Sequence, residues 1–206
     1  MKRSIGLAAV VAAVVVVFVV AGSLIWSKIA ARSQAPQLEG DAIHATLPAP
    51  QAALIDQNGR PYRIADQHGK EVVLFFGYAH CPDICPTTLA RLVQAHRLLG
   101  SAARDVEVAF ITVDPERDTV ATLKRYVGLF DPHFYGLTGS HAALDAFYAA
   151  YHVWHQKLPN HGSAAGYLMA HSSSIYMLDR NGDLRVIHDW NDKPAALAND
   201  MKALLQ

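Results

Sequence analysis

Continuous apolar runs alternate with amphipathic stretches in the middle of this chain. Residues 72–76 (VVLFF) and 106–113 (VEVAFITV) are largely apolar and rich in β-branched side chains, as is typical of buried strands. Each run is followed by apolar residues at helical spacing, namely Leu89, Leu92, Val93 and Leu99, and then Val120, Leu123, Val127 and Phe130. Strands that alternate with helices predict an α/β sandwich.

Turn signals extend this pattern towards both ends of the domain. Asn58-Gly59 and Asn181-Gly182 each predict a β-hairpin, the first forming an N-terminal extension. A short strand is expected at 133–137 and a closing helix at 193–205. Together these elements predict a mixed central sheet flanked by helices.

The segment between the short strand and the second hairpin is predicted in two parts. Ser140 can cap a helix whose apolar stripe is expected in the core and consists of Leu144, Phe147, Tyr151 and Trp154. Residues 156–170 contain one proline and two glycines and are expected to form a long loop. Loops of this length in compact domains are often functional.

The amino terminus carries a different pattern. Residues 5–26 form an uncharged apolar run of 22 residues, enough for a helix of about 33 Å that crosses the hydrocarbon core. A cleaved signal peptide is the alternative, but its apolar region usually has only about 7–15 residues. We therefore predict a single-pass anchor, with residues 1–4 in the cytoplasm, a linker at 27–50 and the globular domain at 51–206.

The charges around the predicted anchor are nearly balanced. Lys2 and Arg3 precede it, and Lys28 and Arg32 follow it. The positive charge of the free amino group therefore favours a cytoplasmic N-terminus. The domain is then expected on the periplasmic side of the inner membrane.

The whole chain has 18 basic and 18 acidic residues, which gives no sign of nucleic-acid binding. Eleven histidines make metal binding worth considering.

The chain's two cysteines lie between the first predicted strand and its helix. Cys81 and Cys85 form a C-x-x-x-C motif, and each is followed by proline. Pro86 suits the first helical position, which would put Cys85 at or beside the N-cap and both cysteines outside the helix. The helix N-terminus favours a thiolate there. Two sulfurs facing outwards on such a turn would form a disulfide or bind a soft metal ion.

A third ligand is predicted from the strand order. A cysteine turn after an early strand is the thioredoxin-like plan, in which the loop before the strand at 174–178 lies beside that turn. Thioredoxins have a cis-proline in this loop, whereas this chain has no proline between 160 and 193 and offers His171. The soft sulfurs would suit Cu(I), and the imidazole would suit either Cu(I) or Cu(II), so the oxidation state of a bound copper ion stays open. Taken alone, His171 also fits a hydrogen-bonded loop residue, and the cysteines fit a structural disulfide.

Three motifs in this order resemble one family. FGYAHCPDICPTTL, VDPERDT and Y-x-x-x-H-S-S are similar to the Sco/SenC family of membrane-anchored copper chaperones, and the likeness covers residues 50–205. The resemblance implies a thioredoxin-like fold and one copper ion per domain, bound by Cys81, Cys85 and His171. It also implies delivery to the CuA site of cytochrome c oxidase subunit II, a role that is not enzymatic in the strict sense. Ala79 departs from the threonine common there.

Two other functions use the same cysteines. As a thiol–disulfide oxidoreductase, the protein would use Cys81 and Cys85 as a redox pair to reduce the CuA-site cysteines or other extracytoplasmic partners. A periplasmic thioredoxin-like reductant or a copper donor would then be a further partner. A peroxidase would need an arginine near its reactive cysteine, and none lies between Lys70 and Arg91 in the sequence.

Five further polar residues are candidates for a site. His80 is expected to project away from its neighbour Cys81. His152 and His155 would lie three apart on a helix with His161 nearby, which fits a second metal cluster but better fits a solvated helix face. Asp114 follows a central strand, where ligand sites gather in α/β sheets. Support of the metal ligands, contact with a partner and an ordinary turn carboxylate are all open for it.

Overall fold

The computed structural model describes residues 13–23, 26, 38–159 and 166–206, and the chain divides into two compact units, Met1–Gln37 and Leu38–Gln206. In the first unit, residues 13–23 are helical and the apolar side chains from Val14 to Val20 are exposed. Among the described residues, no helix has the length and hydropathy needed to cross a membrane. Part of the predicted anchor at 5–26, namely residues 5–12, 24 and 25, lies outside the described residues, and the anchor stays a prediction.

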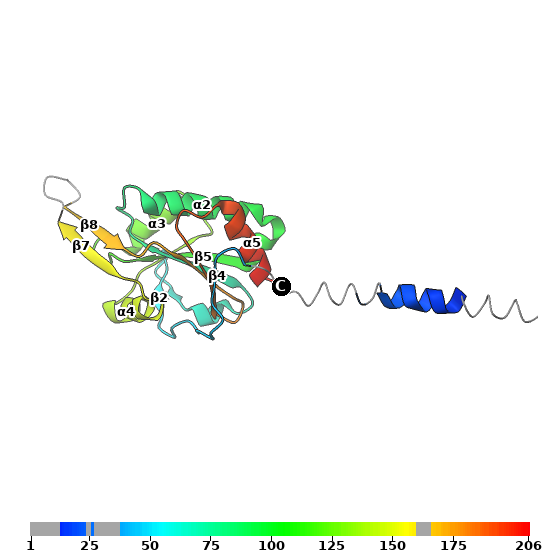
Figure 1. Cartoon of the computed structure of the whole chain (residues 1–206). Helices are drawn as coiled ribbons and strands as arrows, with labels where there is room; N and C mark the ends of the chain where they lie inside the picture. Colours follow the sequence, from blue (N-terminus) through cyan, green and yellow to red (C-terminus); the bar gives the residue numbers. More distant parts are fainter. Residues whose placement is uncertain (1–12, 24–25, 27–37, 160–165) are drawn as a thin grey trace, which may run out of the picture. The chain divides into compact units, whose positions relative to one another are not determined.

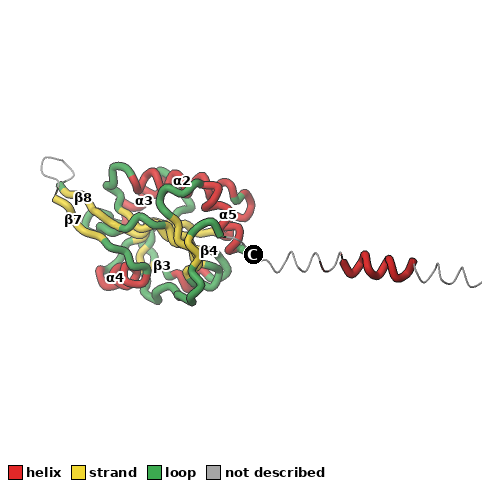
Figure 2. The backbone as a smooth tube through the Cα atoms, in the orientation of Figure 1, coloured by secondary structure: helices red, strands yellow, loops and turns green. Residues whose placement is uncertain are grey.

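The second unit is built on a mixed sheet of six strands in the order β1-β10-β9-β4-β5-β6. Figures 1 and 2 show β4 in the middle of this unit, between the helices. At the centre of the sheet, β4 (Glu71–Gly77) and β5 (Val106–Thr112) are parallel, and both are buried along their whole length. The prediction of buried strands from the continuous apolar runs is confirmed. The remaining strands are β6 (Tyr135–Leu137), β9 (Ile175–Leu178), β10 (Leu184–His188) and β1 (Asp41–Ala42).

Helices cover both faces of this sheet. Figure 1 shows α2 (Ile84–Leu98), α3 (Val120–Gly128) and α5 (Pro194–Leu204) on one side and α4 (His141–Ala150) on the other. Successive residues of β4 point to opposite faces. The Phe75 ring accordingly packs on Phe110 at 6.1 Å, while Phe76 packs on Tyr148 and Tyr151 of the α4 side at 6.2 and 5.8 Å. The predicted thioredoxin-like α/β sandwich is present.

Short elements fill the connections. The predicted hairpin at Asn58-Gly59 is present as β2 (Leu54–Ile55) and β3 (Pro61–Tyr62). Two 3-10 helices, Ile64–Gln67 and Gly100–Asp105, precede β4 and β5. Ser140 caps α4, with its side-chain oxygen accepting the Ala143 N–H. The hairpin at Asn181-Gly182 joins β9 to β10 as predicted.

Residues 38–50 belong to the compact unit, although the sequence places them in the linker. Strand β1 pairs with the edge of β10, and the Leu184 N–H donates to the Leu47 carbonyl at 2.9 Å. Asp200 of α5 accepts the N–H groups of Glu39 and Gly40. The predicted boundary at residue 51 is therefore too late. This arm lacks a sequence periodicity because it is held by backbone pairing with an open strand edge.

The predicted loop at 156–170 is instead a hairpin, with 160–165 outside the described residues. Strand β7 (His155–Pro159) pairs antiparallel with β8 (Tyr167–His171). The prediction was wrong because this two-stranded ribbon is half solvated and has no alternation of apolar and polar residues. Trp154, expected in the core stripe, lies just before β7 and is 56% exposed.

Candidate metal centre

The cysteine turn joins the end of β4 to the first turn of α2. The helix begins at Ile84 with Asp83 as its N-cap residue. Cys85 is therefore the second helical residue and Pro86 the third, so the prediction that both cysteines lie outside the helix is wrong for Cys85. Proline fits here because the first N–H groups of a helix have no partner within it. The Cys85 N–H instead points to the Cys81 sulfur at 3.4 Å.

The two sulfurs have different surroundings. Cys81 is half-buried, whereas Cys85 is fully buried, and both are free thiols. Cys85 packs against Gly77 so closely that a Cβ at Gly77 would lie 2.8 Å from its Sγ. The expectation that both sulfurs face outwards is therefore wrong. Gly77 leaves the space in which the Cys85 sulfur lies.

This difference sets the charge on each sulfur. A hydrogen bond from the Cys85 thiol is the main cause that lowers the pKa of Cys81 to about 4, and the backbone N–H groups of Cys85 and Asp83 add to this against the opposing effect of burial. The hydrogen bond to Cys81 and burial raise the pKa of Cys85. At neutral pH the pair is one thiolate and one thiol.

His171, the last residue of β8, completes the group. Its Nε2 lies 3.5 Å from the Cys85 Sγ, and its Nδ1 lies 2.7 Å from the Ser172 carbonyl oxygen. Because a carbonyl oxygen only accepts, we assign the proton to Nδ1, which leaves the Nε2 lone pair facing the sulfurs. Histidines that bind metals usually donate their other N–H to a carbonyl or carboxylate in this way.

Cys81, Cys85 and His171 lie close together, but they do not form a complete metal-binding site. Among the described residues, no group of three or more His, Cys, Asp or Glu side chains is already arranged to hold a metal ion. The 3.5 Å between Cys85 Sγ and His171 Nε2 matches the roughly 3.5 Å expected between a thiolate and an imidazole on one tetrahedral ion. The structure brings the predicted ligands together, and their role as ligands stays a prediction.

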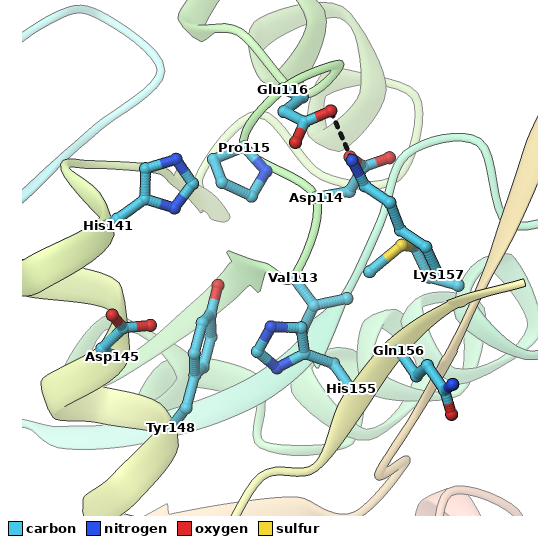
Figure 3. A pocket seen from close by; sticks show the side chains of 11 residues that line it. Val113, Asp114, Pro115, Glu116, His141, Asp145, Tyr148, His155, Gln156 and Lys157 are labelled. Carbon is cyan, nitrogen blue, oxygen red and sulfur yellow. Dashed lines mark hydrogen bonds and ion pairs between the residues drawn. The ribbon is translucent and has the colours of Figure 1, made fainter.

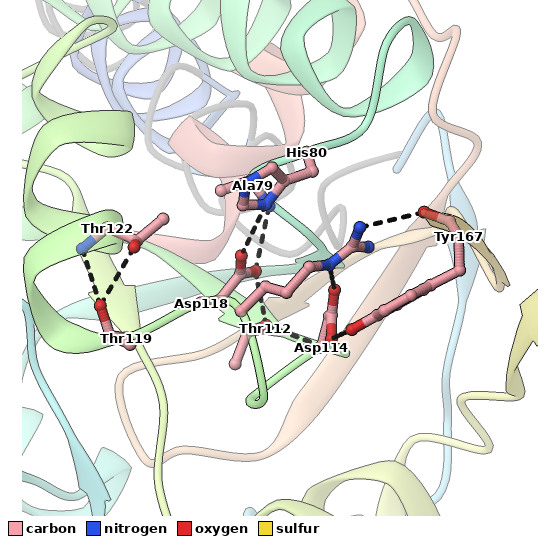
Figure 4. A network of polar contacts seen from close by, with 9 residues as sticks. Ala79, His80, Thr112, Asp114, Asp118, Thr119, Thr122 and Tyr167 are labelled. Atoms are coloured by element: carbon pink, nitrogen blue, oxygen red, sulfur yellow. Dashed lines mark hydrogen bonds and ion pairs between the residues drawn. The ribbon is translucent and has the colours of Figure 1, made fainter. Parts of the chain in front are cut away.

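Asp118 fixes the start of the cysteine turn. Its fully buried carboxylate accepts the Ala79 N–H at 3.0 Å and the Thr112 hydroxyl at 2.7 Å, as Figure 4 shows. The His80 Nδ1 lies 3.6 Å from the other carboxylate oxygen, so His80 faces Asp118. Burial is the main cause that raises the pKa of Asp118. Sequence reasoning missed this residue, although its motif follows β5, whose carboxyl end lies beside that of β4.

The segment between β5 and α3, which contains Asp118, also holds the hairpin that carries His171. Asp114 forms an ion pair with Arg117 at 2.5 Å and accepts the Tyr167 hydroxyl at 2.7 Å. Arg117 donates to the Tyr167 carbonyl at 3.0 Å, and its guanidinium lies 3.6 Å from the centre of the Tyr167 ring (Figure 4). We call Asp114, Arg117 and Tyr167 the clamp. Asp114 thus contacts the hairpin that carries His171, and its three possible roles stay predictions.

The remaining candidate histidines do not form the predicted helical pair. His152 follows α4 with a φ of 51°, and His155 is the first residue of β7. His161 lies outside the described residues. His155 stacks on Tyr148 with ring centres 4.5 Å apart, and burial lowers its pKa. The helical reading was wrong because α4 ends before His152.

Fold and site together define a class: a thioredoxin-like domain with a C-x-x-x-C turn and a histidine on a neighbouring hairpin. The chain belongs to the SCO1/SenC family, whose model matches residues 45–206. A curated relative, the mitochondrial protein SCO2 homolog of Bos taurus, is 43% identical over 132 residues. That match covers 63% of this chain and 49% of the bovine protein, so the chain spans about half the length of this relative.

Solved structures agree with the family. Bradyrhizobium japonicum ScoI with copper bound is 39% identical with a TM-score of 0.68, and the match covers 75% of this chain and 98% of ScoI. Apo Sco1 from Thermus thermophilus is 32% identical with a TM-score of 0.72, covering 84% and 99%. BsSco, described as a member of the Sco family of cytochrome c oxidase assembly proteins, is 20% identical with a TM-score of 0.63 and supports the fold alone.

Proposed function

We propose that this protein is a copper metallochaperone that binds one copper ion through Cys81, Cys85 and His171 and delivers it to the CuA site of cytochrome c oxidase subunit II. The observation that carries the proposal is the position of His171, whose free Nε2 lies 3.5 Å from the Cys85 sulfur. Family membership supports it, as does the copper bound by ScoI at 39% identity.

The pair of sulfurs suits loading of the ion. The Cys81 thiolate is half-exposed and is the first donor that an incoming ion meets. Binding by Cys85 requires its thiol to lose a proton, so loading releases one proton per ion. Two thiolates and one imidazole suit Cu(I) and leave one side of the ion open. Ligands of the acceptor can approach on that side and replace the three donors one at a time.

The direct test substitutes His171 by alanine and titrates the reduced protein with Cu(I) against a competing chelator. We expect the affinity to fall by more than about 100-fold, because one of three ligands is lost and the loss of a mere outer-shell partner of a ligand typically costs 10- to 100-fold. His133→Ala is the matched control, since its exposed side chain pairs with Asp131. Unchanged affinity in His171→Ala would refute the assignment of the third ligand.

A thiol–disulfide oxidoreductase is the second candidate, and the unequal burial of the two cysteines favours it. The Cys81 thiolate would attack a partner disulfide, forming a mixed disulfide and releasing one partner thiolate. Cys85, after losing its proton, would then attack the Cys81 sulfur, which releases the second partner thiol and leaves a Cys81–Cys85 disulfide. A periplasmic thioredoxin-like reductant would restore the dithiol. In this case His171→Ala keeps activity, whereas either cysteine substitution abolishes it.

The cellular setting is part of the proposal. An anchor at residues 5–26 would hold the domain on the periplasmic side of the inner membrane, and copper would be delivered on that side. Protease treatment of spheroplasts tests this arrangement: we expect the domain to be digested while a cytoplasmic marker survives. Protection of the domain in intact spheroplasts would contradict it.

A further inference from the structure

A cavity of about 270 Å³ lies between α4 and the β7–β8 hairpin (Figure 3). His141, Asp145 and Tyr148 line it from α4, and residues 155–157 line it from β7. Figure 3 shows the side chains of His141 and His155 on opposite walls. Met169 of β8 also lines the cavity and is 7% exposed.

The cavity places two soft donors next to His171. His155 pairs with His171 across the hairpin, and Met169 pairs with Lys157. Paired residues share a face of a ribbon, as do residues two apart on one strand. His155, Met169 and His171 therefore lie on the same face. His155 and Met169 are diagonal neighbours, a relation of about 7 to 8 Å that long and aromatic side chains can bridge.

We propose that this cavity is a second, weaker Cu(I) site, with the Met169 thioether and the His155 imidazole as its ligands. The proposal rests on the copper function proposed above. It adds a second site, which holds an ion before the ion moves to the cysteine site. Thioether sulfur and imidazole are donors that Cu(I) prefers, whereas Mg²⁺ and Ca²⁺ prefer oxygen. Both donors are uncharged, so they bind Cu(I) less tightly than two thiolates do. The ion would therefore move on to the cysteine site.

The surrounding charges favour a cation. Two of the carboxylates that line the cavity are paired, Asp114 with Arg117 and Glu116 with Lys157. Asp145 lines the same wall and makes no ion pair with another described residue. Its negative charge faces the cavity from α4 without being a ligand. Silver(I) shares these donor preferences and is a redox-inert probe.

The experiment uses the full chain labelled with ¹³C at the methionine methyl groups. The chain has four methionines, and Met177 and Met201 are fully buried internal references. After one equivalent of Cu(I) has filled the cysteine site, a second equivalent should shift the Met169 signal and leave the Met177 and Met201 signals in place. Met169→Leu, which keeps the packing volume, should lower the affinity for the second ion by about tenfold or more.

Two variants separate this inference from the function on which it rests. Cys81→Ala/Cys85→Ala should still bind one weak Cu(I) or Ag(I) ion with the same Met169 shift, and adding His155→Gln should abolish it. Met201→Leu is the matched control and should change nothing at the site. If the second equivalent leaves Met169 unshifted in the wild-type chain, the second site is refuted while the cysteine site stands. In the wild-type chain, copper bound at Met169 while the cysteine site stays empty would refute the chaperone proposal instead.

Discussion

The cysteine turn and the His171 hairpin face each other across the proposed copper site, but they are positioned in different ways. The turn is set mainly by local structure, because Gly77, Cys81 and Cys85 lie close together in the sequence at the junction of β4 and α2, and Asp118 adds one long-range contact at its start. The hairpin is a two-stranded ribbon outside the main sheet. Its place depends on the clamp, whose members Asp114 and Tyr167 are 53 positions apart. One half of the site is therefore built locally and the other half by long-range contacts.

Asp114→Ala should have the largest effect, and it should act on the hairpin half of the site. It leaves the Arg117 guanidinium and the Tyr167 hydroxyl without their shared carboxylate, so we expect a loss of about 3 kcal/mol in the free energy of unfolding. Copper affinity should fall because His171 loses its fixed position. Urea unfolding and Cu(I) competition measure the two effects. Glu116→Ala removes an exposed ion pair from the same turn and should cost at most about 1 kcal/mol.

Gly77→Ala should damage the cysteine half instead. The new Cβ would lie 2.7 Å from the Phe110 ring and 2.8 Å from the Cys85 sulfur, so one of them must move. We expect a destabilisation of about 1–3 kcal/mol from overpacking. Gly128→Ala, where nothing lies within 4 Å, is the control and should not destabilise the protein. Equal unfolding curves for wild type and Gly77→Ala would contradict the close contact.

Tyr167→Phe should weaken the clamp and keep the ring that stacks on Arg117. The loss of the hydrogen bond to Asp114 should cost about 1 kcal/mol in the free energy of unfolding, with a few-fold fall in copper affinity. A calorimetric titration of Tyr167→Phe and of Asp114→Ala with Cu(I) checks the copper affinity. A loss as large as that of Asp114→Ala would show that the hydroxyl is the main contact.

The pH profile of Cys81 should be least affected by changes in the clamp. Because its pKa is lowered to about 4, the thiolate should be alkylated by iodoacetamide at an undiminished rate from neutral pH down to about pH 5, and the rate should fall as pH drops through 4. Tyr167→Phe should leave this profile unchanged. A midpoint near the ordinary value for cysteine would contradict the hydrogen bond from Cys85.

The sequence allowed prediction of whatever is encoded over short distances. The continuous apolar runs predicted β4 and β5, the Asn-Gly pairs predicted two hairpins, and Ser140 predicted the start of α4. The C-x-x-x-C spacing and the predicted strand order also predicted that His171 lies beside the cysteines. What could not be predicted depends on side-chain packing and long-range contacts that leave no pattern in the sequence, namely the burial of Cys85 against Gly77, the role of Asp118, and the pairing of residues 155–159 with 167–171.

The arm at residues 38–50 has a consequence for solubility. Strand β10 would otherwise present a row of free N–H and C=O groups, which act as a template for pairing with another chain. Strand β1 occupies that row, and at the opposite border of the sheet β6 is three residues long. A chain shortened to the boundary at residue 51 would expose the β10 edge and become prone to self-association. Residues 38–50 therefore protect the domain from aggregation.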